Sequence, residues 1–174
     1  NDQPEPDEVK RAAAALVAWT QPDPGPARWD TETLQSFTGY LVARPYPMLY
    51  ADDRGDGRPG FMLLVEAGKH GGGRRATPFD ERRVIVSGWL LRRDGRLMLE
   101  MESGDAALRT APTAVAAPLP PTSRPLGRVT LRGEIVDAKC FLGAMKPGHG
   151  KTHKECATLC ISGGMPAMLV TRDA

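Results

Sequence analysis

All three cysteines of this chain lie in one segment of its last quarter, and thiols are well suited to soft-metal binding and redox chemistry. They are Cys140, Cys156 and Cys160. Two of the three histidines, His149 and His153, lie in the same segment and add imidazole nitrogens. This crowding indicates where the chemistry of the chain is located, without naming it.

The residues around the second and third cysteines are predicted to form a short helix, from about residue 153 to residue 161. The sequence Thr152-His-Lys-Glu155 has the form of a capping box, in which two side chains accept hydrogen bonds from backbone N–H groups at the helix start. The pair Gly163-Gly164, with Pro166 just beyond, is typical of a helix end. We therefore expect a short helix with defined ends.

This helix would bring several metal-binding side chains to one place. His153, Cys156 and Cys160 occupy positions 0, 3 and 7, so they share one face. Cys140 follows an apolar run, residues 129–136, that is typical of a strand, and a glycine-rich loop leads back toward the helix. Three sulfurs and one nitrogen could thus converge, which is the ligand number of a tetrahedral site.

Three interpretations of the cluster stay open. Cys140 could form a structural disulfide with Cys156 or Cys160, leaving the third cysteine as a small buried apolar residue. The cluster could instead bind a zinc or copper ion, although its C-x15-C-x3-C spacing is not that of a zinc ribbon. Cys156 and Cys160 could also be a redox-active pair. His149 and His70, which lie beside glycines, are predicted to be solvated loop residues.

The composition excludes some classes of function. The formal net charge is +2 and the 23 basic residues are dispersed, which argues against nucleic acid as the main partner. No apolar stretch approaches the roughly 18–20 residues that span a membrane. No Ser/His/Asp array, P-loop or pair of catalytic carboxylates stands out, so we expect a protein that is not an enzyme.

The pattern of elements divides the 174 residues into four segments. Residues 1–30 are predicted to be a helix and a proline linker, and residues 31–110 a first OB-like β module. Residues 111–125 are a Pro/Ala-rich linker. Residues 126–174 are predicted to be a second OB-like module that carries the Cys/His cluster and is incomplete.

The clearest hairpin signal lies in the first module. Two apolar runs, residues 83–91 and 97–101, flank Asp94-Gly95, a dipeptide typical of a type I′ turn. Strand alternation places Val84 and Val86 on the face opposite to Ile85. We expect Trp89 in the interior, since large aromatic side chains add much buried area to a small core.

The fold class that this pattern predicts is mainly β, as tandem small OB-like antiparallel barrels. The run at residues 131–136 resembles the run at 37–42, and residues 165–170 resemble residues 60–65, which suggests a repeated module. A helix before the first module and the short cysteine-bearing helix in the second complete the prediction.

Two segments are predicted to contact a protein partner. The first is the N-terminal helix, in which Val9, Leu16 and Trp19 fall on one apolar face. The second is the unusual sequence Pro45-Tyr46-Pro47, for which a proline-punctuated edge strand is the simpler interpretation. An open second module would also expose a sheet edge near residues 168–171, which a partner could cover.

The motif Gly133-x-Ile-x-Asp137-x-x-Cys140, followed by His153-x-x-Cys156-x-x-x-Cys160-x-x-Gly163, resembles a pattern in a group of exported, largely uncharacterised bacterial proteins with OB-like domains. The resemblance covers about residues 128–172. It implies export and a barrel-like fold, and it adds Asp137 to the motif residues. It implies no particular activity.

We therefore expect an exported, periplasmic or membrane-associated accessory module that binds a protein partner in a larger bacterial assembly, with a membrane anchor outside the given residues. Its Cys/His cluster would be a structural disulfide or a metal site. The alternative is a copper-handling or thiol-redox protein that uses Cys156 and Cys160. Oligonucleotide binding on an OB face is weaker, because basic and aromatic residues do not interleave.

Overall fold

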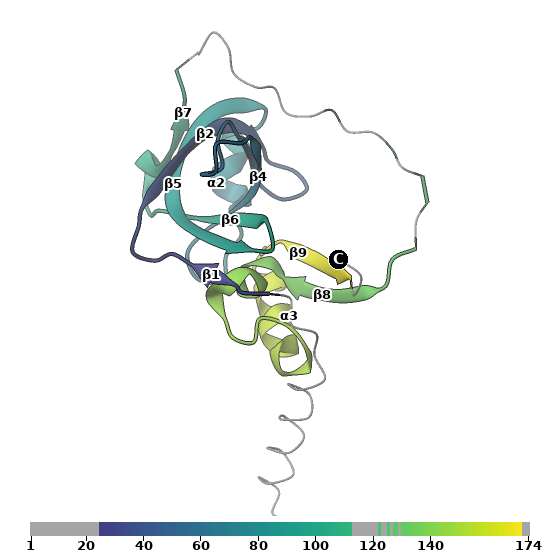
Figure 1. The fold of residues 1–174 in the computed structure, drawn as a ribbon. Helices are drawn as coiled ribbons and strands as arrows, with labels where there is room; N and C mark the ends of the chain where they lie inside the picture. Colours follow the sequence, from purple (N-terminus) through teal and green to yellow (C-terminus); the bar gives the residue numbers. More distant parts are fainter. Residues whose placement is uncertain (1–24, 113–121, 123–124, 126, 129, 172–174) are drawn as a thin grey trace, which may run out of the picture.

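The computed structural model describes all residues of the chain except 1–24, 113–121, 123–124, 126, 129 and 172–174 (Figure 1). The predicted N-terminal helix and its anchors Val9, Leu16 and Trp19 lie outside the described residues, as does most of the predicted linker.

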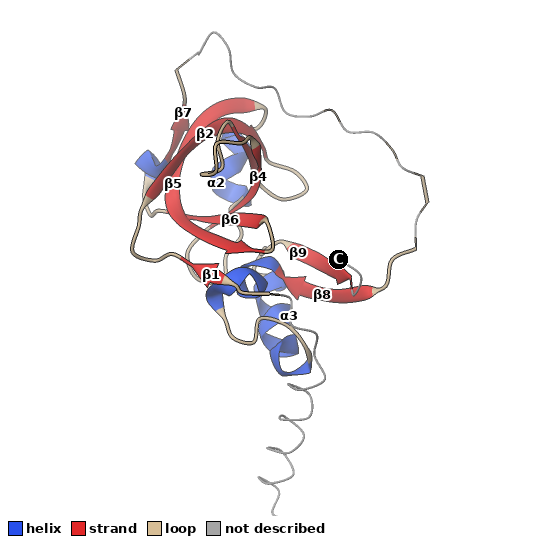
Figure 2. Cartoon of the chain, in the orientation of Figure 1, coloured by secondary structure: helices blue, strands red, loops and turns tan. Residues whose placement is uncertain are grey.

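Strands dominate the described part of the chain, as predicted (Figure 2). The strands are β1 (Arg28–Trp29), β2 (Gln35–Val42), β3 (Met48–Ala51), β4 (Gly60–Val65), β5 (Arg82–Arg93), β6 (Arg96–Met101), β7 (Leu108–Thr110), β8 (Gly133–Asp137) and β9 (Ala167–Thr171). The helical elements are α2 (Gly73–Ala76), η1 (Thr77–Phe79), η2 (Asp105–Ala107), η3 (Cys140–Ala144), η4 (Lys151–His153) and α3 (Lys154–Ser162).

Five strands close into a small barrel. β2 pairs with both β3 and β5, β3 pairs with β4, and β6 pairs with both β4 and β5, so the sheet returns to its start. All these pairings are antiparallel except that of β4 with β6, which is parallel. β1 and β7 extend the sheet as further partners of β5. A mainly β chain with a small barrel is therefore confirmed.

The long strand β5 shows how sequence alternation fills this barrel. Val84 and Val86 are fully buried in the barrel core, whereas Ile85 between them is partly exposed. At the tip of the β5–β6 hairpin, Asp94 and Gly95 both have positive φ, of 49° and 70°, as a type I′ turn requires. Both features were predicted.

The prediction for Trp89 was wrong. Trp89 lies three residues after Val86, so alternation turns it to the outer face of β5, where it is partly exposed. The alternating apolar residues of β5 together fix which face of the strand is buried. Their combined effect overrides the general preference of one large aromatic side chain for the core.

The segment after residue 130 packs on the outside of the barrel rather than standing apart from it. Val65, Leu91 and Met98 point outward from β4, β5 and β6 and are fully buried in a second apolar cluster. The chain from β8 onward covers them. Its buried members in this cluster are Val136, Ala138, Cys140, Phe141, Leu142, Cys160 and Met165. The cysteine-bearing segment and the outer face of the barrel therefore share one apolar cluster, and Figure 1 shows the segment below the barrel.

Within residues 130–171 the described strands are β8 and β9 alone, which form a two-stranded antiparallel sheet. Their sequences were matched to β2 and β4, but in the barrel β3 lies between those two strands, whereas β8 and β9 pair directly. The described residues thus contain one closed barrel, and a second barrel stays a prediction.

A buried ion pair joins the two parts of the structure. Lys139, next to Cys140, pairs with Glu100 on the outer face of β6, and the two residues are 5% and 8% exposed. Arg93 of β5 adds a second polar link, since its Nη1 donates to the carbonyl of Phe141 at 2.9 Å. Buried charges are tolerated only when they are paired. The segment must therefore pack on the barrel for these buried groups to keep their partners.

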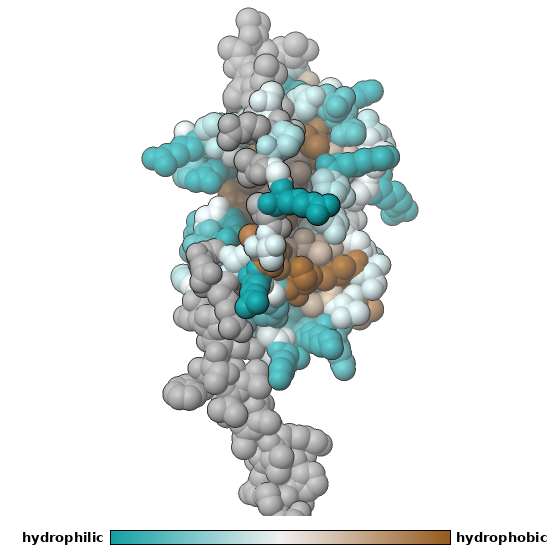
Figure 3. Space-filling view, turned by 90° about the vertical axis from the view of Figure 1, so that its right-hand side faces the viewer, coloured by the Kyte–Doolittle hydropathy of each residue, from teal (hydrophilic) through white to brown (hydrophobic). Residues whose placement is uncertain are grey.

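The sheet around β8 and β9 exposes apolar side chains. Figure 3, viewed from the side of the molecule on which β9 lies in Figure 1, shows apolar surface in the lower half. Ile135 and Leu169 are direct cross-strand partners and are 58% and 37% exposed. Leu131, just before β8, is 61% exposed.

We predict that Gly39→Ala destabilises the barrel, because a Cβ at residue 39 would lie 2.2 Å from the carbonyl oxygen of Tyr50 on β3. The expected loss in the free energy of unfolding is about 1–3 kcal/mol or more, measured by urea denaturation. Gly73→Ala is the control, since nothing lies within 4 Å of the Cβ it would gain. Equal stability of the two variants would contradict the packing described here.

We predict that Lys139→Met lowers the free energy of unfolding by about 3–5 kcal/mol, because it leaves the Glu100 carboxylate buried without its partner. The double variant Lys139→Met/Glu100→Met should recover part of this loss, since it removes both charges. Chemical denaturation of the three proteins measures both effects. A single variant as stable as wild type would show that the ion pair does not join the two parts.

Candidate metal centre

The three cysteines converge from two separate elements. Cys140 is the first residue of η3, which begins shortly after β8, and Cys156 and Cys160 lie on α3. Their three Sγ atoms all lie within 4.8 Å of one another. Cys140 and Cys160 are buried and Cys156 is partly exposed. The predicted approach of the three sulfurs is therefore present, and it forms a triangle with one accessible corner.

All three cysteines are free, so the disulfide expected as one interpretation does not form in this structure. Instead, the two helical sulfurs both accept hydrogen bonds from one lysine. Lys69 Nζ lies 3.0 Å from Cys156 Sγ and 3.3 Å from Cys160 Sγ. The lysine thus places one positive charge beside two side chains of the type that binds metals and exchanges disulfides.

The helix that carries two of the sulfurs closely matches its predicted bounds, with α3 at Lys154–Ser162. The capping box is absent, since no side-chain hydrogen bond caps the start of α3. The reason is that the 3-10 turn η4 includes Thr152, which moves the first residue of the helix one position later than predicted. At the other end, Gly163 N donates to the carbonyls of Leu159 and Cys160, as expected of a glycine stop.

Asp137 organises the other side of the cluster. Its carboxylate is fully buried, and its Oδ1 accepts a hydrogen bond from the backbone N–H of Cys140 at 2.8 Å. Its Oδ2 lies 3.0 Å from Nε2 of His153, which is 4% exposed. The aspartate therefore ties the start of η3 to the turn that precedes α3, and so brings Cys140 to the helical cysteines.

His153, predicted as the fourth ligand, is placed differently from the three sulfurs. One ring nitrogen of His153 lies within 4.8 Å of ligand atoms of both Asp137 and Cys140, and these three residues form a second group. Cys140 thus belongs to both groups, whereas His153 does not group with Cys156 or Cys160. The four predicted ligands occupy one region, but only the sulfurs surround a common centre.

The surroundings hold the buried thiols protonated. Burial is the main cause that raises the pKa of Cys140, and the charge and hydrogen bond of Asp137 raise it further. Burial and Asp137 also raise the pKa of Cys160, while the Lys69 ammonium opposes this shift. The sulfurs of Cys156 and Cys160 in turn raise the pKa of Lys69, which keeps the lysine charged. A bound metal cation would supply the positive charge that allows the two buried thiols to ionise.

Lys69 and Lys139 were not predicted from the sequence. Lys69 lies in a glycine-rich loop that resembles an ordinary turn, and its partners lie 87 and 91 residues later in the chain. Lys139 lies beside Cys140, but its buried contacts also come from distant residues. Only Asp137 had a sequence signal, through its place in the resemblance motif.

The other predicted residues lie elsewhere or play simpler roles. His70 is exposed, as predicted, whereas His149 is partly buried and its ring lies 6.2 Å from that of Phe141, so it is not the solvated residue expected. In the β2–β3 loop Pro45 is exposed and Pro47 is buried, with its carbonyl accepting a hydrogen bond from Leu64 N–H. Tyr46 between them is partly exposed.

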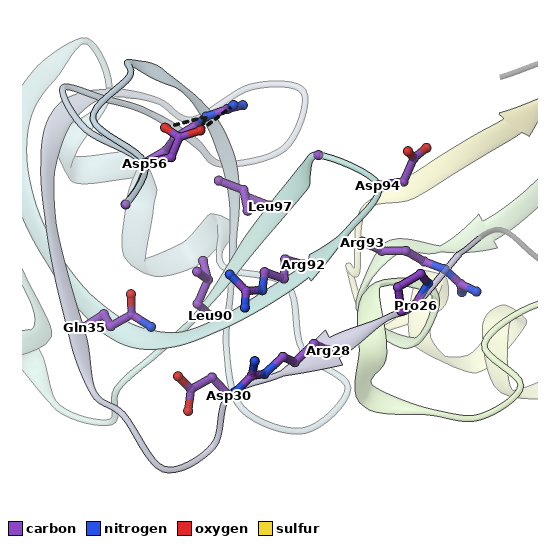
Figure 4. Close-up of a pocket in the computed structure, with 13 residues that line it drawn as sticks. Pro26, Arg28, Asp30, Gln35, Asp56, Leu90, Arg92, Arg93, Asp94 and Leu97 are labelled. Carbon is purple, nitrogen blue, oxygen red and sulfur yellow. Dashed lines mark hydrogen bonds and ion pairs between the residues drawn. The ribbon is translucent and has the colours of Figure 1, made fainter.

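A separate hollow of about 440 Å³ lies at one end of the barrel (Figure 4). Arg28 and Arg92 line it as direct cross-strand partners, and Arg54 lines it while paired to Asp56 at 2.8 Å. Its lining includes neither cysteine nor histidine. Acidic residues also line the hollow, so it is not the uniformly basic surface that nucleic-acid binding favours.

Comparison with known proteins adds no assignment, since no family model, curated protein or solved structure matches the chain. Among the described residues no helix is long and apolar enough to cross a membrane.

We predict that native protein is alkylated first at Cys156, because its thiol is the most accessible of the three and lies beside the Lys69 ammonium. Cys140, 5% exposed, should react slowly. Timed iodoacetamide labelling followed by peptide mass spectrometry gives the order. In denaturant the three should react alike, and faster labelling of Cys140 than of Cys156 in the native protein would contradict the described burial.

Proposed function

We propose that this chain is a non-enzymatic binding module that holds one soft metal ion, copper or zinc, through Cys140, Cys156 and Cys160. The observation that carries the proposal is the convergence of three free sulfurs from two elements within 4.8 Å of one another. Thiolates are ligands that select soft and borderline metals.

The groups around the sulfurs support a binding rather than a catalytic role. Asp137 and His153 are hydrogen-bonded to each other in the interior, and Lys69 donates hydrogen bonds to the sulfurs of Cys156 and Cys160. Such partners orient ligands and tune their charge. The thiol of Cys140 does lie beside His153 and Asp137, but all three residues are buried, which disfavours access of a substrate to this group.

The barrel that supports the site is, we propose, of OB type. The strand order β2-β3-β4-β6-β5, the parallel pair β4–β6 and the short helix α2 between β4 and β5 support this assignment. OB-type barrels often serve as compact supports for inserted functional segments, and here the cysteine-bearing segment covers the outer face of β4, β5 and β6.

We also propose that the module is exported and acts as an accessory subunit of a membrane-associated assembly. The resemblance motif supports export. The exposed cross-strand pair Ile135–Leu169 supports contact with a protein partner, since exposed apolar sheet surface is ordinarily covered.

A thiol-redox role for Cys156 and Cys160 is the second candidate, because both sulfurs share the ammonium of Lys69. In that role the Cys156 thiolate would attack a small-molecule disulfide and release one small thiol. Cys160 would then attack the resulting mixed disulfide, which forms a Cys156–Cys160 disulfide and releases the second small thiol. The two candidates differ in the part played by Cys140, which only the metal site requires.

The test is to load the reduced protein with Cu(I) and, separately, with Zn(II) under anaerobic conditions, desalt it, and measure bound metal and reactive thiols. We predict one ion per chain for the preferred metal, with all three thiols protected from thiol reagents. Cys140→Ser should lose binding as severely as Cys156→Ser or Cys160→Ser. Thr158→Ala, an exposed substitution on the same helix, is the control and should bind as wild type.

The pH dependence follows from the raised thiol pKa values. Because Cys140 and Cys160 are protonated at neutral pH, metal binding must release their protons, so affinity should fall as pH falls. Absence of bound metal in the wild type, or binding that survives Cys140→Ser unchanged, would overturn the metal proposal. The second outcome together with disulfide formation between the helical cysteines would favour the redox role.

A further inference from the structure

The lysine above the sulfurs belongs to the barrel, not to the cysteine-bearing segment. Lys69 lies in the loop between β4 and α2, and its ammonium contacts the sulfur of the partly exposed Cys156 and that of Cys160. The third sulfur, Cys140, is buried on the side of Asp137 and His153. The ammonium therefore lies on the accessible side of the sulfur triangle, where Lys69 itself is exposed.

The loop that carries Lys69 is fixed from two sides. Lys139 Nζ donates to the carbonyls of Glu66 and Gly68, at 3.1 and 2.9 Å, so the residue beside Cys140 anchors the loop at its start. At its end, Gly71 N–H donates to the carbonyl of Gly163 at 3.1 Å, just past α3.

This second contact needs glycine on both sides. A Cβ at Gly163 would lie 2.1 Å from the carbonyl oxygen of Lys69, and a Cβ at Gly71 would lie 2.0 Å from that of Gly164. The backbone of Lys69 thus lies directly against the end of the helix that carries two of the sulfurs. These contacts fix the backbone position from which the Lys69 side chain extends to the two sulfurs.

A protonated lysine in this position cannot be a ligand. Its ammonium has three N–H donors and no lone pair, so it can bond thiolates but cannot coordinate a metal. Zinc is almost always four-coordinate in proteins, so three sulfurs alone leave it one ligand short.

We propose that Lys69 makes this a three-coordinate thiolate site that prefers Cu(I) over Zn(II), by occupying the position that a fourth ligand would need. This inference rests on the proposed function and names its metal. Cu(I) is soft, takes three thiolates readily and needs no water ligand. Three thiolates and one Cu(I) carry a charge of −2, which the ammonium reduces to −1 without entering the coordination sphere.

The rival arrangement is a zinc site with His153 as fourth ligand. The contact of Nε2 with Asp137 is of the kind that orients a ligating histidine, which would leave Nδ1 for the metal. The geometry opposes it, because His153 groups with Asp137 and Cys140 and not with the sulfurs of Cys156 and Cys160. His153→Ala separates the two arrangements, since only the rival needs this ring for binding.

The experiment compares wild type, Lys69→Met, Lys69→Arg and Lys69→His by competition of Cu(I) and Zn(II) against chelators of known affinity. Lys154→Met, an exposed lysine on α3, is the matched control. We expect Lys69→Met to shift the Cu(I)/Zn(II) affinity ratio toward zinc by about tenfold or more, and Lys69→His to shift it further by adding a ligand. Lys69→Arg should keep the copper preference, and Lys154→Met should change nothing.

The outcomes separate this inference from the proposed function. If the wild type binds neither metal, the metal site itself is wrong, and Lys69 has no metal to select. If the wild type binds metal but Lys69→Met keeps the ratio of Lys154→Met, the site stands and the role of Lys69 is overturned. A wild-type preference for zinc that His153→Ala abolishes would establish the rival. Circular dichroism of each variant checks folding, and the wild-type preference is informative without any variant.

Discussion

The arrangement around the cysteines depends on one buried carboxylate. Asp137 has no solvent-exposed surface, and its two oxygens are used by the backbone N–H of Cys140 and by the ring of His153. A carboxylate removed from water is stable only with such partners. Those partners lie at the two ends of the long loop that separates Cys140 from α3, so satisfying Asp137 closes the loop and brings the first sulfur to the other two. The need to satisfy this one buried group by hydrogen bonding therefore sets the position of Cys140 relative to the two helical cysteines.

The barrel acts as more than a support for this segment. Its outer face supplies apolar area through Val65, Leu91 and Met98, and its Glu100 pairs with Lys139 beside the first cysteine. The same Lys139 ammonium holds the loop from which Lys69 reaches the sulfurs. Lys139 therefore both holds the segment on the barrel and positions the loop of Lys69. Its ion pair and hydrogen bonds explain how a charged residue can be only 5% exposed there.

Local patterns could be predicted from the sequence, and long-range contacts could not. The β5–β6 hairpin followed from Asp94-Gly95, and the grouping of the cysteines followed from helical spacing and a glycine-rich loop. The prediction for Trp89 was wrong because it relied on the preference of large aromatic side chains for the core instead of on strand alternation. The position of the segment on the barrel, and with it Lys69, depends on close glycine contacts between residues 71 and 164, for which periodicity carries no signal. Position in the fold, rather than residue type, gives Lys69 its role.

X-ray absorption at the metal edge of the loaded wild-type protein counts the atoms bound to the ion, and so shows whether the three cysteines hold it together. We expect a single ion surrounded by three sulfur scatterers, at about the 2.3 Å typical of metal–thiolate bonds. A first shell of only nitrogen and oxygen, or of fewer than three sulfurs, would contradict the conclusion that Cys140, Cys156 and Cys160 form one metal centre.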